Sequence, residues 1–283
     1  MKQAIQQKAI PGIIGGLGPL AHIEFERRLI AFNAERGISC DRDHPVWILI
    51  NATDVPDRTQ SLLGNAPSCT PSLVKYGKML QMAGADFLVV TCNTAHGFYQ
   101  AVQSQLDIPW IHLMDVTAAF IQSSYPESSK VGVLATTGTL QAKLYHHSLS
   151  ALGFTVIAPS LEDQLQQDIM NAIYHPVWGI KATGIEMSPT PIAILDNAMT
   201  WLEKQGTEIV IAGCTEISVV LKQLKYNSIV DIDPLDILAH QTLDLAFGHQ
   251  DIPIIRHLQK RGNREQGTGN REPTPRPSQE GSN

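Results

Sequence analysis

Two of the four cysteines in the sequence, Cys92 and Cys214, occupy positions where a thiol could transfer protons. Each follows a short apolar run that predicts a strand and precedes a stretch that predicts a helix. A helix start offers unpaired N–H groups and a positive dipole end, which lower the pKa of a thiol and attract a carboxylate. If both sulfurs faced one carbon atom, a thiolate could remove its proton while the opposite thiol protonated the other face, which would racemise the substrate.

The placement of these two cysteines is repeated along the chain. The segment Gly12–Gly18 resembles Gly132–Gly138, and the segment Gly84–Cys92 resembles Gly206–Cys214. Cys92 lies 80 residues after Gly12, and Cys214 lies 82 residues after Gly132. Either cysteine alone would be interpreted as a buried core thiol, because free cysteine is often buried. The equivalent placement of the pair favours a shared chemical role.

Two basic residues in polar segments could bind an acidic substrate. Arg58 lies in the loop that follows the second predicted strand, and Asn51 begins that loop. A guanidinium can hold a carboxylate through two parallel hydrogen bonds, although a surface ion pair is an equally good interpretation of one arginine. Lys181 lies between Gly179 and Gly184 and could hold a distal carboxylate, or it could be an ordinary solvated lysine.

Other polar side chains near the predicted turns complete the candidate site. Hydrogen-bond donors around a substrate carboxylate would stabilise the carbanion that forms when the α-proton leaves. The further candidate substrate-binding residues are Gly18, Asn93, Thr94, Thr137, Thr139, Thr215 and Glu216. The first turn, Gly15–Pro19, matches a nucleotide-binding fingerprint only weakly, and no acidic residue ends a second strand at the expected spacing, so nucleotide binding is set aside.

Short apolar runs alternate with amphipathic stretches along the chain. This alternation is typical of βαβ units and of a parallel sheet covered on both faces. The predicted strands are 12–14, 47–51, 86–90, 110–112, 130–134, 155–158 and 208–212. The predicted helices are 21–36, 72–83, 94–106, 139–152, 162–174 and 193–205. We therefore predict an α/β protein with two pseudo-symmetric parallel-sheet domains and an active site in the cleft between them.

The repeat also suggests how the chain is divided. We predict a first lobe from residues 1–115 and 225–255, which carries Cys92, and a second lobe from residues 116–224, which carries Cys214. Residues 256–283 are nearly free of apolar side chains and cannot bury enough surface to offset their ordering entropy. We predict that this last segment is a flexible tail.

Composition limits the class of protein. The 283 residues carry a formal net charge of −6, with 43% hydrophobic and 17% charged residues, an ordinary globular balance without the basic footprint of nucleic-acid binding. No apolar run predicts a membrane span, and the polar N-terminus lacks the apolar core of a signal peptide. We therefore expect a cytoplasmic protein with reduced thiols. The cysteine spacing shows no zinc pattern, so no metal is expected.

At these residues the sequence resembles the aspartate/glutamate racemase family, in its aspartate racemase branch. Five stretches in the family's order carry the resemblance: Gly15-Gly-Leu-Gly-Pro19, Val55-Pro-Asp-Arg-Thr59, Cys92-Asn-Thr-Ala-His96, Gly179-Ile-Lys181 and Gly213-Cys-Thr-Glu216. Glu216 is similar to the aspartate branch, because glutamate racemases of the cell-wall type usually carry His there. The chain also resembles the cyanobacterial racemases that supply a D-amino acid for microcystin-type peptides.

The resemblance implies an activity and roles for the candidate residues. It implies that the two cysteines are the acid/base groups, that no cofactor is needed, and that the protein is a homodimer acting on a small acidic amino acid. It implies that Asn93, Thr94 and Thr215 hold the α-carboxylate of the substrate. It also implies that Arg58 and Lys181 hold the side-chain carboxylate, with aspartate as the preferred substrate.

Several alternatives remain at this point. The substrate could be glutamate or both acids, and a maleate isomerase, hydantoin racemase or arylmalonate decarboxylase could use the same scaffold. The decarboxylase usually keeps one working cysteine, and a maleate isomerase would use one cysteine as a nucleophile. A cysteine pair flanked by Arg58 and Lys181 fits a dicarboxylic amino acid better. A non-catalytic two-lobed binding protein is the third alternative, but such proteins are commonly exported and no signal peptide is predicted.

Overall fold

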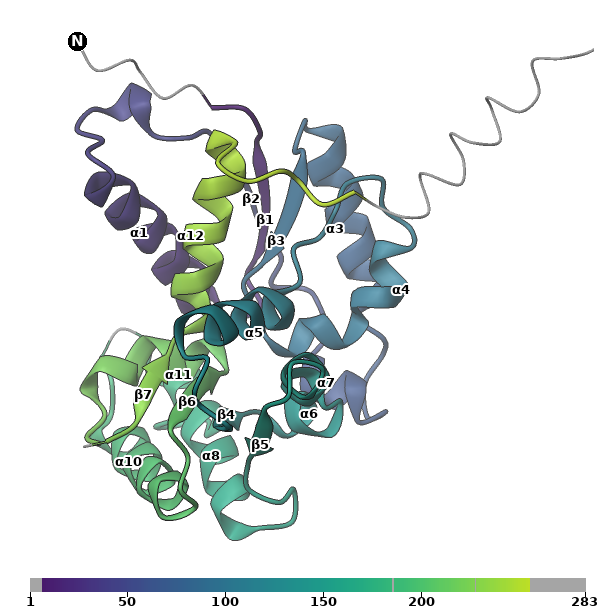
Figure 1. Ribbon diagram of the computed structural model, residues 1–283. Helices are drawn as coiled ribbons and strands as arrows, with labels where there is room; N and C mark the ends of the chain where they lie inside the picture. Colours follow the sequence, from purple (N-terminus) through teal and green to yellow (C-terminus); the bar gives the residue numbers. More distant parts are fainter. Residues whose placement is uncertain (1–6, 185, 227, 255–283) are drawn as a thin grey trace, which may run out of the picture. The chain divides into compact units, whose positions relative to one another are not determined.

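The computed structural model describes residues 7–184, 186–226 and 228–254, in which strands and helices alternate (Figure 1). The strands are β1 (Pro11–Gly15), β2 (Ile48–Asn51), β3 (Phe87–Val90), β4 (Lys130–Ala135), β5 (Thr155–Ile157), β6 (Ile209–Gly213) and β7 (Val230–Ile232). The α-helices are α1 (Pro19–Glu35), α2 (Arg58–Leu62), α3 (Thr70–Met82), α4 (Tyr99–Gln103), α5 (Leu113–Ser124), α6 (Thr137–Gln141), α7 (Leu144–Ser150), α8 (Gln164–Tyr174), α9 (Ile180–Thr183), α10 (Pro189–Lys204), α11 (Thr215–Val220) and α12 (Pro234–Phe247). Short 3-10 helices are η1 (Asp41–Asp43), η2 (Thr94–Phe98) and η3 (Leu221–Gln223).

The first sheet contains three parallel strands in the order β2-β1-β3. Side chains alternate across a strand, so Ile13 and Ile14 of β1 enter two different cores. Ile13 packs in the core that contains residues of α1 and α12, and Ile14 packs in the core that contains residues of α3. Figure 1 shows these helices on the two faces of the sheet. The carboxyl ends of β1, β2 and β3 therefore meet at one edge, where the first half of the candidate site is expected.

The second sheet contains four parallel strands in the order β5-β4-β6-β7. One face of β4 and β6 packs with residues of α8 and α10 in a core of its own. The other face, which includes Val131 and Ile211, belongs to the same core as Ile13 and Phe87 of the first sheet. The predicted class of two parallel-sheet α/β regions is confirmed. The two regions also share a continuous core, because one face of each sheet is buried against common helices.

Among the predicted strands and lobes, two assignments differ from the structure. Residues 110–112 do not form a strand: Trp110 makes a single bridge to Leu88, and α5 begins at Leu113. The assignment of all of 225–255 to the first lobe was wrong, because β7 pairs with β6 in the second sheet. No strand was predicted there because two of the three β7 residues are exposed and three residues are too few to show an alternating pattern.

After β7 the chain crosses to α12, which packs against α1 and α5. Asp233 caps the start of α12 by accepting a hydrogen bond from the backbone N–H of Leu235 at 2.9 Å. Arg28 of α1 forms a buried ion pair with Asp233 at 2.8 Å and a partly exposed ion pair with Asp236 at 3.2 Å. These contacts join the last helix to the helix that follows β1, and removing one partner of such a buried pair usually costs several kcal/mol. The remaining lobe boundaries stay a proposal.

Two further predictions concern the C-terminal tail and membrane-spanning helices. The predicted tail, residues 256–283, lies outside the described residues. No helix within the described ranges is both long and apolar enough to cross a membrane.

Candidate active site

Cys214 lies between the end of β6 and the first residue of α11, where it forms the N-cap position. Its side chain is buried, and its thiol donates a hydrogen bond to Oε2 of Glu216 at 3.1 Å. Burial and the adjacent Glu216 carboxylate raise the pKa of Cys214 well above the usual value for a thiol. Cys214 is therefore a protonated thiol in this arrangement, despite its place at a helix start.

Glu216 is also paired with a cation. It is buried, it contacts the ammonium group of Lys181 from α9, and it accepts a hydrogen bond from Thr215 Oγ1 at 3.2 Å. Burial by itself would raise the pKa of the Glu216 carboxyl, but the Lys181 charge outweighs burial and lowers it. Burial would likewise lower the pKa of Lys181, but Glu216 raises it. Both groups are therefore charged at neutral pH.

Gly18, the N-cap residue of α1, lies directly against this ion pair. A Cβ atom at this position would overlap Oε1 of Glu216 and lie 3.1 Å from Nζ of Lys181. The turn after β1 can therefore approach the ion pair only because residue 18 has no side chain.

Substituting Gly18 by Ala is expected to displace the Lys181–Glu216 pair and to lower the kcat/KM of the reaction at this site about 10-fold or more, because small misplacements of a site are costly. Activity and thermal unfolding should be measured together. The control is Gly153→Ala, where φ is 91° but no atom lies within 4 Å of the added Cβ. That variant should lose stability and keep its activity while folded. Full activity in Gly18→Ala would contradict this account.

Cys92 lies just past β3 and is buried beside the guanidinium of Arg58, which begins α2. The guanidinium also donates hydrogen bonds to three backbone carbonyl oxygens, those of Leu17 (2.5 Å), Val55 (3.3 Å) and Pro56 (3.1 Å). Burial disfavours the charge on Arg58, but Cys92 and other acidic neighbours outweigh burial and raise its pKa. A permanently charged guanidinium therefore lies beside the Cys92 sulfur, whereas a carboxylate lies beside the Cys214 sulfur. The charged groups next to Cys92 and Cys214 therefore have opposite signs, positive at Cys92 and negative at Cys214.

A cavity of about 400 Å³ opens between these groups. Arg58 lines it together with Lys181 and Glu216. The other lining residues are Gly16, Leu17, Gly18, Pro19, Leu20, Thr53, Ile180 and Gly184. Neither sulfur lines the cavity itself. Each contacts a lining residue, Cys92 the guanidinium of Arg58 and Cys214 the carboxylate of Glu216, and both sulfurs interact electrostatically with Lys181.

The segment after Cys92 is held by the second half of the chain. Asn93 Oδ1 accepts a hydrogen bond from the hydroxyl of Tyr145 at 2.5 Å. Thr94 Oγ1 lies 3.0 Å from Oγ1 of both Thr136 and Thr139, and those two hydroxyls lie 3.1 Å apart. The predicted residues Thr94 and Thr139 are therefore brought together, but their hydroxyl groups bond to each other in a buried ring.

Of the predicted substrate-binding residues, Gly18, Arg58, Lys181 and Glu216 line the smaller cavity, whereas Asn51, Asn93, Thr94, Thr137, Thr139 and Thr215 do not. Asn51 ends β2 beside Gly16 and is exposed. Thr137 accepts a hydrogen bond from Gln166 of α8 at 3.3 Å, and its backbone N–H contacts Met170 Sδ at 3.2 Å. Neither residue lines the cavity, although both follow strand ends as predicted.

Tyr174, the last residue of α8, also contacts the candidate site, although no sequence motif indicates it. The Lys181 ammonium lies over its ring, 5.5 Å from the ring centre. Burial raises the pKa of its phenol, and the neighbouring Cys214 adds to that shift. Its apolar helix pattern gave no signal of a role in the site, because a tyrosine at the end of a predicted amphipathic helix is more often a packing residue.

His96 contacts the backbone of Cys92. Its Nδ1–H donates to the backbone carbonyl of Cys92 at 2.9 Å, and its ring lies against those of Trp110 and His112. Burial, with a smaller contribution from His112, lowers the pKa of His96 to about 3. The side chain is therefore neutral at physiological pH.

This depressed pKa predicts a pH dependence of stability. The unfolded state takes up a proton near pH 6.5 and the folded state does not, so stability is complete above pH 6.5 and is lost as the pH falls toward 3. The slope from His96 is about 1.4 kcal/mol per pH unit below pH 6. Urea unfolding at pH 7 and pH 5 should show a smaller loss in His96→Asn, which keeps a donor for the Cys92 carbonyl. Equal losses in both proteins would refute this assignment.

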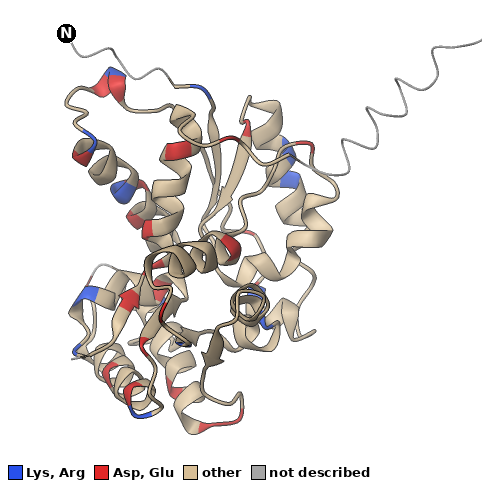
Figure 2. Cartoon of the chain, in the orientation of Figure 1, with Lys and Arg blue, Asp and Glu red and all other residues tan. Residues whose placement is uncertain are grey.

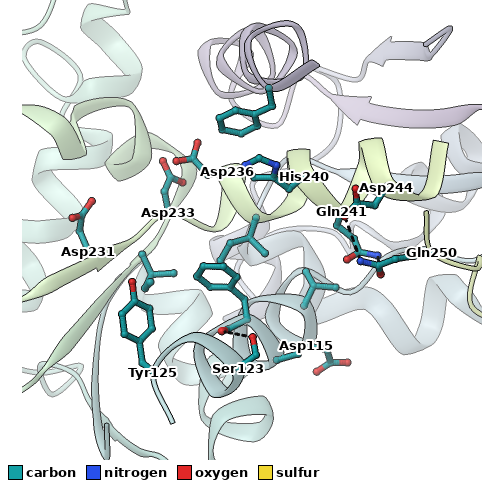
Figure 3. Close-up of a pocket in the computed structure, with 16 residues that line it drawn as sticks. Asp115, Ser123, Tyr125, Asp231, Asp233, Asp236, His240, Gln241, Asp244 and Gln250 are labelled. Atoms are coloured by element: carbon teal, nitrogen blue, oxygen red, sulfur yellow. Dashed lines mark hydrogen bonds between the residues drawn. The ribbon is translucent and has the colours of Figure 1, made fainter. Parts of the chain in front are cut away.

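A larger cavity, of about 910 Å³, lies beside α5, β7 and α12 (Figure 3). Five aspartates line it: Asp115, Asp231, Asp233, Asp236 and Asp244. Burial and the neighbouring Asp233 raise the pKa of Asp236, which shows that negative charge is already unfavourable there. The basic residues Arg28 of α1 and Arg36 at the C-cap of α1, a helix with blue segments in Figure 2, already pair with Asp233, Asp236 and Asp244. An acidic ligand is therefore better accommodated by the smaller cavity with Arg58 and Lys181.

Comparisons with known proteins agree with this arrangement. The family model described as Asp/Glu/Hydantoin racemase matches residues 14–242. A broad specificity amino-acid racemase of Bacillus subtilis is 26% identical over 240 residues, which cover 84% of this chain and 99% of that protein. The aspartate racemase of Picrophilus torridus has a TM-score of 0.71 at 25% identity, covering 89% of this chain and 98% of that one.

A glutamate racemase of Bacillus anthracis has the same fold, with a TM-score of 0.57 at 20% identity over 88% of this chain and 85% of that one. The matched region contains both cysteines, the lining residues of the smaller cavity and nearly all of the two sheets. The chain belongs to the Asp/Glu/hydantoin racemase family and is an amino-acid racemase.

Proposed function

We propose that this protein interconverts L- and D-aspartate without a cofactor, and that Cys92 and Cys214 are its two acid/base groups. The observation that carries the proposal is the opposite charge beside the two thiols. The Arg58 cation lies beside Cys92, and the Glu216 carboxylate accepts a hydrogen bond from Cys214. A racemase with two acid/base groups needs one thiolate and one thiol in each direction, and these surroundings favour that state.

The proton transfers follow from this asymmetry. The Cys92 thiolate removes the α-proton from one enantiomer, and the Cys214 thiol protonates the opposite face of the carbanion. The enzyme is then left with a Cys92 thiol and a Cys214 thiolate, which carries out the reverse reaction on the other enantiomer. No electrons or groups other than protons are transferred.

The charges at the cavity suit a substrate with two carboxylates. We propose that Arg58 and Lys181 bind the side-chain carboxylate, and that Lys181 exchanges part of its contact with Glu216 for the substrate. This exchange would also open the path from the cavity to the buried sulfurs. The α-carboxylate would then bind at the strand ends, where Asn93, Thr94 and Thr215 lie next to the two cysteines.

The other candidate residues would act around this core. Gly18 and Glu216 would form the wall against which Lys181 rests. Thr139 would reach the substrate only if the hydroxyl ring with Thr94 opens. Asn51 and Thr137 stay proposed substrate-binding residues without a direct contact to the cavity.

The test is an exchange experiment in D₂O with L- and D-aspartate, both enantiomers of glutamate, and maleate. We expect inversion of aspartate with deuterium entering the α-carbon. Inversion without α-deuterium, or hydration or isomerisation of maleate in its place, would overturn the proposal. Because one methylene in a pocket is worth only about 1–3 kcal/mol, some turnover of glutamate is compatible with it.

A broader substrate range is the second candidate, because the Bacillus subtilis relative that matches nearly its full length is named for broad specificity. Adding alanine and lysine to the panel separates the two, since neither carries a distal carboxylate for Arg58 and Lys181.

We also propose a cytoplasmic homodimer. Helix α1 exposes Ile23 and Ile30, two turns apart on one face, which is consistent with a covered surface.

A further inference from the structure

We infer that Tyr145 is a positioning residue that fixes the side-chain amide of Asn93 so that its NH₂ group receives the α-carboxylate of the substrate. The inference rests on the proposed function and adds to it a residue of the second half of the chain. Tyr145 lies outside the five sequence stretches that resemble the racemase family, and it does not line the smaller cavity.

The hydrogen bond between the two residues sets the orientation of the amide. The Tyr145 hydroxyl lies 2.5 Å from Oδ1 of Asn93, and both side chains are 1% exposed. That distance suits an O–H···O bond, whereas an N–H···O bond prefers 2.7–3.2 Å. Oδ1 therefore faces the phenol and Nδ2 faces away from it. Burial raises the pKa of the Tyr145 phenol well above its usual value, so the phenol stays a donor.

The amide nitrogen of Asn93, which this bond directs away from the phenol, can still donate hydrogen bonds. Nδ2 of Asn93 is buried, and it has no hydrogen-bond partner among the described residues. A buried amide normally finds partners, and an orphaned donor in a site indicates a group that binds there. A carboxylate oxygen is a strong acceptor for such a donor. Asn93 directly follows Cys92, so the amide and the sulfur belong to the same strand end, after β3.

The hydroxyl groups next to Asn93 are bonded to one another, so they do not hold its side-chain amide. Thr94, the next residue, already shares its hydroxyl with Thr136 and Thr139 in the buried ring. Like the Tyr145 contact, this ring joins the segment after β3 to elements that follow β4. The orientation of Asn93 is thus decided by α7, which is 52 residues away in sequence from the amide it holds.

The test is Tyr145→Phe, which removes only the hydroxyl. The KM for aspartate should rise about 10-fold, with a smaller change in kcat, because the amide is free to turn its oxygen toward the carboxylate. The same rise is expected for any amino acid that the wild-type protein inverts, since all carry the α-carboxylate. Inhibition by β-alanine should be unchanged, because β-alanine is aspartate without its α-carboxylate.

A double-substitution cycle separates positioning from a purely structural role. If Tyr145 acts through Asn93, adding Tyr145→Phe to Asn93→Ala should cause no further loss of kcat/KM. The matched control is Thr242→Val, which removes a buried hydroxyl that bonds the Leu238 carbonyl within α12, a helix that contributes no lining residue to the smaller cavity. That control should lower the unfolding temperature to a similar extent without changing KM.

Each outcome decides the inference. An unchanged KM in Tyr145→Phe, a parallel weakening of β-alanine, or additive losses in the double variant would overturn it. Racemisation by the wild-type protein with any of these results would leave the proposed function intact. A wild-type protein that inverts no amino acid would overturn the proposed function and this inference together.

Discussion

Cys92→Ser and Cys214→Ser are each expected to lower the rate of aspartate inversion by about 10³-fold or more, because a hydroxyl is a far weaker acid than a thiol and does not supply the anionic base. Each substitution replaces one sulfur atom by oxygen and nearly preserves the volume of the side chain, so folding should be little affected. Polarimetry or chiral chromatography measures the inversion, and thermal unfolding confirms that the variants are folded.

The two variants should differ in the exchange that survives. Cys214→Ser keeps Cys92 beside Arg58, so it should still exchange the α-proton of one enantiomer with D₂O. Cys92→Ser keeps Cys214 beside the Glu216 carboxylate, where burial and charge keep the thiol protonated, so its residual exchange should be slower. The enantiomer that Cys214→Ser exchanges identifies the face served by Cys92.

The matched control is Cys40→Ser. Cys40 is a partly exposed free thiol that donates to Asp43 at 2.9 Å, away from both strand ends. It should invert aspartate at the wild-type rate. Normal inversion in either Cys92→Ser or Cys214→Ser would exclude the two-thiol mechanism.

The second large effect is expected from Lys181→Met, which leaves the buried Glu216 carboxylate without its cation. Stripping one partner from a buried pair is costly, and because the Lys181 side chain is 24% exposed we expect a loss of about 2–3 kcal/mol in the free energy of unfolding. The kcat/KM for aspartate should fall about 100-fold or more, since the distal carboxylate loses a cation. Urea unfolding and steady-state kinetics measure the two effects.

The double variant Lys181→Met/Glu216→Gln separates these two roles. Removing both charges should restore most of the lost stability, because no uncompensated charge stays buried, while activity should stay low. The control is Lys75→Met, which breaks an exposed pair with Asp54 at 3.9 Å and should cost less than about 1 kcal/mol. Activity that recovers together with stability would show that Lys181 acts only through folding.

The local sequence pattern was sufficient to predict where the catalytic candidates stand in the fold. The apolar runs that end at Val90 and Gly213 form buried parallel strands, so Cys92 and Cys214 follow strand ends as predicted. The βα alternation also predicted the two-sheet class, because a strand buried on both faces and an amphipathic helix leave distinct periods in the sequence. Arg58, Lys181 and Glu216 were named from polar motifs, and they meet at one cavity.

Only the tertiary structure decided what each polar group touches. The sequence could not indicate that Thr94 and Thr139 bond to each other, that Tyr145 holds Asn93, or that Glu216 pairs with both Lys181 and Cys214. Most of these contacts join residues 35 to 52 positions apart, and no local period or turn signal encodes such distances. The opposite charges beside the two thiols also arise from packing, because a charged group acts on its spatial neighbours regardless of their separation along the chain.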